Sequence, residues 1–506
     1  MNIALLLSMA AEGFGERIAV GDVESGLTYA ALHERALAVA EGLRSEPGDN
    51  VVFVDVNSEV LPVLLFAASA SGKRFVPLNY RLPDDQLRRV LARSAPGIVV
   101  AGPSATSRVG GVDGLRVVAS EYLPVTSGGV PAVAPDASPM SVAVLLFTSG
   151  TTGEPKAAVL RHENLTSYIV GSVEFMGAGP DECAIVSVPP YHIAGISAVL
   201  SSVFAGRRIV YLEQFDAVDW VRTAREQSVT HAMVVPTMLA RILQVLEDDP
   251  RGLPDLRHLS YGGGRMPLPV IEQALFLLPH VDFTNAYGLT ETSSTVAVLT
   301  PEDHRRAISD QDPLVRARLG SVGRPLPSIE LTVRDADGAE VGAGGRGEVW
   351  VRGPQVSGEY EGLGTRLDDG WFHTRDAGRL DDEGYLYVEG RLDDVIVRGG
   401  ENISPGEVED VLVAHPGIRE AAVFGVPDVE WGEAVAAVLV PEPEGRPSCE
   451  EVADWVRMQL RSTKVPSHIE FRDALPYTDS GKLLRRAVRD DVVRGRRGVA
   501  TPTSAT

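Results

Sequence analysis

Short apolar runs alternate with amphipathic segments over the first 320 or so residues of the chain. The apolar runs occupy residues 51–56, 97–102, 143–150 and 184–190. Helical patterns lie between them, for example at 27–43 and 84–94. A helix that connects two strands returns the chain to the end of the sheet at which the first strand began. Strands joined in this way therefore run parallel. The alternation predicts an α/β fold with largely parallel sheets.

The pattern changes after about residue 320. Short β-like runs separated by Gly and Asp turns then dominate, at 329–335, 347–353 and 385–390. A last segment begins near residue 391 and holds a helix-start signature, with Ser404 as the cap and Pro405 in the first turn. The segments 420–428 and 433–442 follow as strands of a small α/β unit. The chain has 506 residues, which is more than a single hydrophobic core usually serves. We therefore expect it to divide into a large and a small domain.

Composition excludes several classes of protein. The formal net charge of -22 and the pI near 4.9 argue against nonspecific nucleic-acid binding and against docking on anionic lipid. They leave a local basic pocket for phosphates open. The two cysteines, Cys183 and Cys449, form neither a disulfide framework nor a CxxC motif, which indicates a reducing compartment.

No targeting or membrane segment is predicted. The apolar run near the N-terminus has no preceding positive charge, unlike a signal peptide. The apolar stretch at 60–72 is too short to span a bilayer and is interpreted as core. We expect a cytoplasmic protein without a membrane span.

The run FTSGTTGEPKA at 147–157 follows an apolar strand directly. Its glycines let successive backbone N–H groups point into one concavity, its hydroxyls add donors, and Lys156 adds a positive charge, which suits a polyphosphate. A solvated loop has the same composition. The Walker A pattern is missing, so a P-loop NTPase is disfavoured.

Other segments supply what a nucleotide-triphosphate site needs. Residues 284–292 offer Tyr287 as an aromatic platform, Thr290 as a hydroxyl donor and Glu291 as a carboxylate for Mg²⁺. Asp376 suits a diol such as ribose, and Lys482 follows a Ser-Gly turn. Each has a plainer alternative: core packing for Tyr287, a turn for Asp376 and a solvated surface for Lys482.

Together these motifs resemble the adenylate-forming superfamily of acyl-CoA synthetases, peptide-synthetase adenylation domains and luciferases. The similarity runs from about Leu27 to Arg486, and the motifs fall in the family's order: TSGTTGEPK, YHIAG, YGGGRMPL, AYGLTE, GEVWVRGP, HTRDAG, GRLDDVIVRGGENISPGEVE and SGKLLRR.

The resemblance implies an architecture and a division of the chain. It implies a large N-terminal domain, 1–391, of two mixed or parallel α/β subdomains and a small β-barrel-like subdomain. A linker, 392–394, would join it to a mobile C-terminal α+β domain, 395–506. Asp393 would be the hinge about which the small domain turns between two half-reactions.

The resemblance also implies the reaction and its substrates, MgATP, a carboxylic acid and CoA. The carboxylate attacks the α-phosphorus, pyrophosphate leaves, and a thiol then displaces AMP. Lys482, Thr290, Glu291 and His192 are the expected catalytic residues, with Glu291 also binding Mg²⁺. The phosphates would be held by Thr148, Ser149, Gly150, Thr151, Thr152, Gly153 and Lys156.

The nucleoside and the thiol would be held elsewhere. Adenine is expected beside Gly263, Gly264, Ala286, Tyr287 and Gly288, and ribose on Asp376 and Arg391. Arg375 stands where a glycine often precedes the aspartate in the family, so it either forms an outward salt bridge or alters nucleotide contact. CoA would lie against Arg398, Gly399, Gly400 and Lys464, although for Lys464 solvated surface is the alternative.

The acyl pocket is expected to draw on His192, Ile193, Ser197, Val235, Thr237, Met238 and Gly263. His192 has a second interpretation as a buried structural histidine. No acidic residue occurs from 191 to 206, so nothing there would pair the ammonium of an amino acid. A medium or long, aromatic or bulky apolar acid is therefore favoured.

The acceptor is expected to be CoA, because no carrier domain follows residue 506 and the region 347–376 is compact. The alternatives are an acyl-AMP ligase that loads a carrier protein and an enzyme or binding module that handles an adenylate in one half-reaction only. Luciferase-type oxidation is disfavoured. The partners are the acid, ATP and CoA, and a homodimer is left open.

Overall fold

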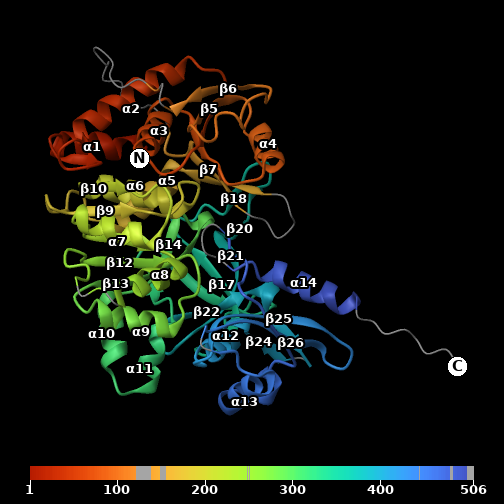
Figure 1. Cartoon of the computed structure of the whole chain (residues 1–506). Coiled ribbons are helices and arrows are strands. Elements are labelled where there is room, and N and C mark those ends of the chain that lie inside the picture. Colours follow the sequence, from red (N-terminus) through yellow and green to blue (C-terminus); the bar gives the residue numbers. More distant parts are fainter. Residues whose placement is uncertain are drawn as a thin grey trace.

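The computed structural model describes residues 1–120, 123, 138–148, 155–247, 249, 251–399, 401–443, 445–478 and 483–498. Within these residues the strands form four sheets, which we call sheets A to D. Figure 1 shows the two large sheets one above the other and the C-terminal unit at the lower right.

Sheet A has nine strands, and the six in its middle run parallel. In spatial order they are β15 (Arg324–Pro325), β14 (Ser294–Leu299), β13 (Asp282–Leu289), β12 (His258–Gly262), β11 (His231–Val234), β9 (Cys183–Val186), β10 (Arg208–Tyr211), β1 (Ile18–Val20) and β2 (Leu27–Thr28).

Sheet B has eight strands and a parallel half. Its order is β19 (Gly364–Thr365), β18 (Glu359–Tyr360), β8 (Lys156–Arg161), β7 (Val142–Thr148), β4 (Arg74–Pro77), β3 (Asn50–Val54), β5 (Gly97–Ala101) and β6 (Leu115–Ala119). Its antiparallel end includes β18, which pairs with β8 through Tyr360 and Ala158. In the sequence β18 follows β8 by about 200 residues. This pairing carries Tyr360 to the phosphate-loop strands.

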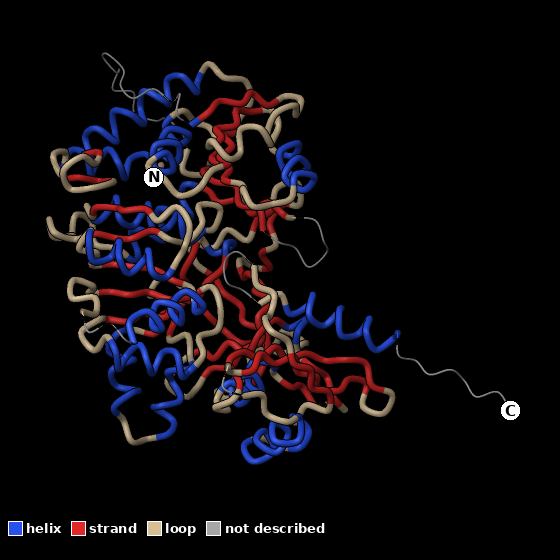
Figure 2. The backbone as a smooth tube through the Cα atoms, in the orientation of Figure 1, coloured by secondary structure: helices blue, strands red, loops and turns tan. Residues whose placement is uncertain are grey.

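Helices cover both faces of the large sheets (Figure 2). One hydrophobic cluster lies between sheets A and B and includes side chains of α1 (Ala4–Phe14), α2 (Tyr29–Arg44), α3 (Val60–Ala70), α5 (His162–Ser172) and α6 (Ile193–Ala205). The other face of sheet A packs on α7 (Ala217–Glu226), α8 (Pro236–Glu247) and α9 (Leu268–Leu277). The other face of sheet B packs on α4 (Asp84–Arg93). Beyond β14 lie α10 (Pro301–Ser309) and α11 (Pro313–Ala317).

Sheet C follows as a small antiparallel sheet with its own core. It consists of β16 (Glu330–Arg334), β17 (Arg346–Arg352), β20 (Leu367–Asp368), β21 (Trp371–Leu380) and β22 (Leu386–Arg391).

Sheet D belongs to the C-terminal unit, with α12 (Pro405–Val413) and α13 (Cys449–Gln459) on one face and α14 (Arg485–Gly498) on the other. Its strands are β23 (Ile396–Arg398), β24 (Glu401–Ile403), β25 (Ile418–Asp428), β26 (Gly432–Pro441) and β27 (His468–Phe471). The predicted fold class, two mixed or parallel α/β subdomains with a small β-barrel-like subdomain and a small C-terminal α+β domain, is confirmed; the barrel-like part is a half-barrel sheet. The exact division at 392–394 stays a prediction.

Local structure follows the sequence closely, with two differences. The run 184–190 is a strand only to Val186, because Pro189 and Pro190 cannot continue a central ladder. The pattern at 27–43 begins with two strand residues, and Thr28 then caps α2 by accepting from the amide of Ala31 at 3.1 Å.

The predicted cap at Ser404 is confirmed. Its hydroxyl accepts from the amide of Glu407 at 3.4 Å and donates to the carbonyl of Glu389 at 2.8 Å, which attaches α12 to β22. The apolar stretch from residue 60 forms the buried helix α3, as expected for a core segment. Among the described residues, no helix combines the length and the apolar character needed to cross a bilayer.

One buried histidine makes stability depend on pH. His304 is fully buried; Nδ1 donates to the carbonyl of Thr300 and Nε2 accepts from the hydroxyl of Tyr261, both at 2.8 Å. Burial lowers its pKa to about 4. The unfolded chain therefore binds the proton more readily, and stability is lost as the pH falls from about 6.5 to about 4.

We predict that the His304→Gln variant loses stability less steeply with falling pH than the wild type. Between pH 7 and pH 5, the wild type should lose about 2 kcal/mol more than the variant in urea unfolding. Burial also lowers the pKa of His162 to about 4. His162 is present in both proteins, so its contribution to the loss of stability cancels in the comparison. Equal losses in the two proteins would contradict the prediction.

Candidate active site

Asp376 is a buried carboxylate at the meeting point of sheets A and C. It lies on β21 opposite Arg391, the last residue of β22, and the two are in register across the ladder. Arg391 Nε is 3.2 Å from one carboxylate oxygen, and Tyr287 donates its hydroxyl to the other at 2.7 Å. Burial, with the charge of Asp376, raises the pKa of Tyr287, which keeps this hydroxyl a donor. Three residues predicted to bind the nucleoside are thus in contact.

The residues expected beside adenine occupy the carboxyl ends of two parallel strands. Gly263 and Gly264 follow β12, and Ala286, Tyr287 and Gly288 lie near the end of β13. Gly263 has φ +77°, a conformation that favours glycine, and an added Cβ at Gly288 would lie 1.8 Å from the carbonyl of Ser294. Ligands of α/β sheets bind at such strand ends.

The phosphate loop begins and ends on neighbouring strands of sheet B. Thr148 ends β7 and Lys156 begins β8; they pair across the ladder, and the hydroxyl of Thr148 donates to the carbonyl of Lys156 at 3.3 Å. The predicted phosphate ligands Ser149, Gly150, Thr151, Thr152 and Gly153 lie outside the described residues, as do Gly400 and Lys482.

Glu291 lies in a short 3₁₀ turn after β13 (Thr290–Thr292) and is buried. Its carboxylate accepts a hydrogen bond from the hydroxyl of Tyr360 on β18, and its carbonyl accepts from the amides of Ser357 and Gly358 at 2.9 and 3.1 Å. Thr290, beside it, is half-buried. The turn therefore connects sheet A to the strand pair β8–β18 of sheet B.

Tyr360 is a site residue that the sequence interpretation missed. Burial and the negative charge of Glu291 raise its pKa, so it remains a neutral donor to that carboxylate. Lys156 Nζ lies 5.7 Å from the centroid of its ring. Nothing in the segment GEYEGLG marks it, because only the pairing of β18 with β8 brings Tyr360 to the site.

These residues fit the binding of Mg²⁺ by one carboxylate together with substrate phosphates. Mg²⁺ keeps several waters and seldom needs a full protein cage. The described part of the chain contains no group of three or more His, Cys, Asp or Glu side chains suited to a metal. Glu291, oriented by Tyr360, would be the protein ligand.

The predicted acyl-pocket residues fall into two groups. His192 is the N-terminal cap residue of α6, and Ile193 and Ser197 lie in its first turns. The side chain of Ser197 is buried, and its hydroxyl has no hydrogen-bond partner among the described residues. Ile193 packs in the cluster between the large sheets.

The second group lies around β11 and α8. Val235 and Met238 pack in the cluster on the α8 face, and Thr237 lies between them in the first turn of α8. Val235 reaches towards Gly263, since a Cβ added there would lie 3.6 Å from Val235 Cγ1. Val235 and Gly263 are thus neighbours, whereas Met238 and Ile193 belong to different clusters.

A further apolar and hydroxylic surface lies on the α6 side of sheet A. In-register pairing aligns Met233, Ser260 and Thr284 on one face of β11, β12 and β13. These three side chains are half-buried, whereas Ala232, Leu259 and Phe283 on the opposite face are closed in the α8 cluster. Ala194 and Ala198 of α6 are also half-buried and pack in the same cluster as Met233. We call Met233, Ser260, Thr284, Ala194 and Ala198 the acyl face.

The linker and the candidate CoA residues make defined contacts. Asp393 lies in the 3₁₀ turn Leu392–Asp394, and its carboxylate accepts from the guanidinium of Arg375 at 2.7 Å. Arg398 donates to the carbonyl of Thr463 at 2.6 Å, and Gly399, with φ +57°, packs against Trp431. Lys464 is not solvated surface: its ammonium binds Glu407 at 2.6 and 2.7 Å with the side chain 12% exposed.

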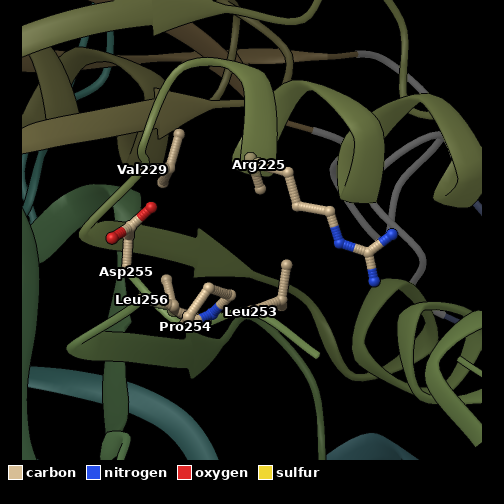
Figure 3. Close-up of a pocket in the computed structure, with 7 residues that line it drawn as sticks. Arg225, Val229, Leu253, Pro254, Asp255 and Leu256 are labelled. Atoms are coloured by element: carbon tan, nitrogen blue, oxygen red, sulfur yellow. The ribbon is translucent and has the colours of Figure 1, made fainter. Parts of the chain in front are cut away.

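A separate shallow hollow lies beside α7 and is lined by Ala224, Arg225, Val229, Leu253, Pro254, Asp255 and Leu256 (Figure 3). The guanidinium of Arg225 is already bound to Asp249 at 2.8 Å and to the carbonyl of Gly252 at 2.9 Å. The hollow carries none of the predicted site residues.

A family model described as AMP-binding enzyme matches residues 7–361, and one described as AMP-binding enzyme C-terminal domain matches residues 407–482. The chain belongs to this family, the adenylate-forming superfamily that includes acyl-CoA and aryl-CoA ligases. The predicted family and the predicted enzyme class, an AMP-forming acid–thiol ligase, are confirmed at this level.

Individual relatives cover nearly the whole chain. A feruloyl-CoA synthase from Amycolatopsis sp is 35% identical over 478 residues, covering 92% of this chain and 94% of the relative. The fatty acid–[acyl-carrier-protein] ligase ScoC from Streptomyces coeruleorubidus is 33% identical over 482 residues, covering 92% and 91%. The solved o-succinylbenzoate coenzyme A synthetase from Bacillus subtilis, in complex with ATP and magnesium ion, has a TM-score of 0.81 and 30% identity, covering 95% and 98%.

We predict that the Tyr360→Phe variant lowers kcat/KM for MgATP about ten- to a hundredfold. A hydrogen bond to a charged group contributes about 1.5–3 kcal/mol, and its loss leaves Glu291 without its orienting donor. Acid-dependent pyrophosphate exchange, measured over a series of Mg²⁺ concentrations, should show the loss as a higher Mg²⁺ requirement.

The matched control is Tyr385→Phe. Tyr385 is buried and makes a similar bond, donating to Asp303 at 2.6 Å away from the site. This variant should lose stability and keep its Mg²⁺ requirement. If both variants lose activity equally, Tyr360 has no special role.

Proposed function

We propose that the protein is an acyl-CoA ligase that converts an aromatic or other bulky apolar carboxylic acid into its CoA thioester through an acyl adenylate. The observation that carries the proposal is the contact of Asp376 with Tyr287 and Arg391. Glu291 follows the strand of Tyr287 and binds Tyr360, and Lys156 Nζ lies 5.7 Å from the ring centroid of Tyr360. These side chains provide a diol-binding carboxylate, a Mg²⁺ ligand and a phosphate-binding charge in one place.

Each residue has a distinct task in the proposed first half-reaction. Asp376 and Arg391 bind the ribose hydroxyls, and Tyr287 flanks the adenine. Lys156 and Thr148, with the loop between them, hold the β- and γ-phosphates that leave as pyrophosphate. Glu291 would hold Mg²⁺, which when bound would neutralise part of the phosphate charge. Lys482 bridges the carboxylate and phosphate oxygens, so that negative charge gathers against fixed positive groups.

In the second half-reaction the thiol of CoA attacks the acyl carbon and AMP leaves. The small domain would turn about Asp393 to bring Arg398, Gly399 and Gly400 to the pantetheine arm. Lys464 would bind a CoA phosphate only after releasing Glu407. We place the reaction in the cytoplasm, and the free thiols of Cys183 and Cys449 are compatible with a reducing compartment.

The class of acid is inferred from the acyl face. An amino acid is disfavoured because α6 carries no acidic residue to pair an ammonium. The side chains of the acyl face are half-buried and uncharged, and all but Met233 are small, which would suit a flat ring, with Ser260 and Thr284 able to bond a ring substituent. Similarity to a feruloyl-CoA synthase supports the aromatic choice.

A carrier-protein thiol is the second candidate acceptor, because one similar protein is an acyl-carrier-protein ligase. The chemistry at the acyl carbon is the same for both thiols. Incubation of the adenylate-forming mixture with CoA and, separately, with a phosphopantetheinylated carrier protein would distinguish them.

The test is mass spectrometry of products from MgATP, CoA and a panel of acids that runs from acetate through fatty acids to benzoates, cinnamates and polycyclic acids. An aryl-CoA or bulky acyl-CoA product is expected, and Lys482→Ala should abolish acyl-adenylate formation. Thioester formed only from supplied acyl adenylate would reduce the proposal to the second half-reaction. If no acid gives either the acyl adenylate or the thioester, the proposal is overturned.

We predict that the Ser260→Phe variant loses at least tenfold in kcat/KM for a cinnamate-sized acid and keeps its value for acetate. The phenyl ring would fill the space over β12 that a large acid needs, and a small acid does not reach it. Ser172→Phe, on an exposed position of α5, is the control and should change neither value. Equal losses for both acids would mean that Ser260 affects folding only.

A further inference from the structure

We propose that Arg375 is a positioning residue that holds the linker residue Asp393 and thereby favours the orientation of the small domain seen in this structure. The proposal rests on the proposed function only for its kinetic readout. It also accounts for the arginine at a position where the family often has glycine.

The backbone of Arg375 is strained. Its φ is +63°, a left-handed conformation that glycine adopts freely and that costs other residues free energy. The amide of Arg375 donates to the carboxylate of Glu348 at 2.9 Å, which helps to hold this conformation. A strained residue next to the buried Asp376 indicates a function that offsets the strain.

The side chain supplies that function. The guanidinium of Arg375 is 2.7 Å from a carboxylate oxygen of Asp393, and both side chains are more than half exposed. Arg375 belongs to the large domain, so the ion pair attaches the linker to sheet C. A pair this exposed is modest in strength and screened by salt.

The next linker residue is held from the opposite side. Arg485, at the start of α14 in the small domain, lies 3.3 Å from the carboxylate of Asp394 and 2.7 Å from Glu409. Two successive aspartates are therefore bound by arginines of two different domains. A turn about 392–394 changes the dihedral angles between them and separates Asp393 from Arg375.

Other contacts identify the orientation that the pair favours. Asp410 and Glu407 of α12 form ion pairs with Arg265 and Arg346 of the large domain. Tyr477 bridges to Leu483, and the guanidinium of Arg241 on α8 is near enough to lower the pKa of the Tyr477 hydroxyl, which burial and Glu420 raise. Arg265 follows Gly264, one of the residues expected beside adenine, so α12 contacts the large domain on the side of the expected nucleotide site. We therefore assign this orientation to the first half-reaction.

A direct test measures the orientation itself, without substrate. Cys449 on α13 is exposed, and burial raises the pKa of the Cys183 thiol to about 11, so only Cys449 should take a spin label. A second label on Ser309→Cys, in α10, then reports the distance between the domains. Arg375→Ala should broaden or shift this distance distribution, and Arg375→Lys should largely restore it. An unchanged distribution in Arg375→Ala would overturn the proposal.

The kinetic test compares the two half-reactions. In Arg375→Ala, the ratio of the pyrophosphate-exchange rate to the rate of thioester formation from supplied adenylate should fall about two- to fivefold, the effect expected of an exposed ion pair. In the wild type, added salt should lower the ratio towards the variant's value. Asp393→Asn combined with Arg375→Ala should add nothing further, because both remove the same pair.

Two more variants separate positioning from stability. Arg375→Gly removes both the strain and the ion pair, so it should unfold at a higher temperature than Arg375→Ala and show the same altered ratio. Arg352→Ala removes a comparable ion pair with Glu330, 3.1 Å apart on neighbouring strands, and should leave the ratio unchanged. A ratio that follows melting temperature across the variants, or that also changes in Arg352→Ala, would overturn the proposal. Failure to detect either half-reaction in the wild type would instead contradict the proposed function. The distance measurement would then still test the role of Arg375.

Discussion

The buried charge of Asp376 is the constraint on which the rest of the site depends. A carboxylate out of water costs several kcal/mol unless it is paired and hydrogen-bonded. Asp376 is satisfied by Tyr287 from sheet A and by Arg391 at the end of β22. The bond from Tyr287 fastens sheet C to sheet A, and the contact with Arg391 holds the residue from which the chain enters the linker.

A second bond of the same kind joins the other pair of sheets. Tyr360 of sheet B donates to Glu291, which follows β13 of sheet A. Two tyrosine–carboxylate hydrogen bonds therefore meet where three sheets converge, and beside them the phosphate-loop strand β7 ends and β8 begins. In an otherwise acidic protein with a net charge of -22, Lys156 and Arg391 supply positive charge locally, which the gathering of phosphates requires.

The linker joins this rigid site to a domain that the proposed reaction needs in two positions. Arg375 and Arg485 bind neighbouring aspartates from opposite domains, and the pair that attaches the linker to the large domain, Arg375 with Asp393, is exposed. Exposed pairs are weak enough to break within a catalytic cycle, whereas a buried apolar interface would not be. The strained backbone at Arg375 is the cost of placing a charge where glycine would fit without strain.

The sequence alone determined what depends on short-range order. Apolar periodicity predicted the α/β layers, the cap at Ser404 predicted the start of α12, and the ordered motifs predicted the family and the convergence of Tyr287, Asp376 and Arg391. Only the tertiary structure decided contacts between distant segments. Tyr360 reaches Glu291 because β18 pairs with β8 across about 200 residues, and Met233, Ser260 and Thr284 share a face through the register of three strands. The same limit applies to Arg375: a local pattern shows that an arginine replaces a glycine, but strand register and the path of the linker decide that it meets Asp393.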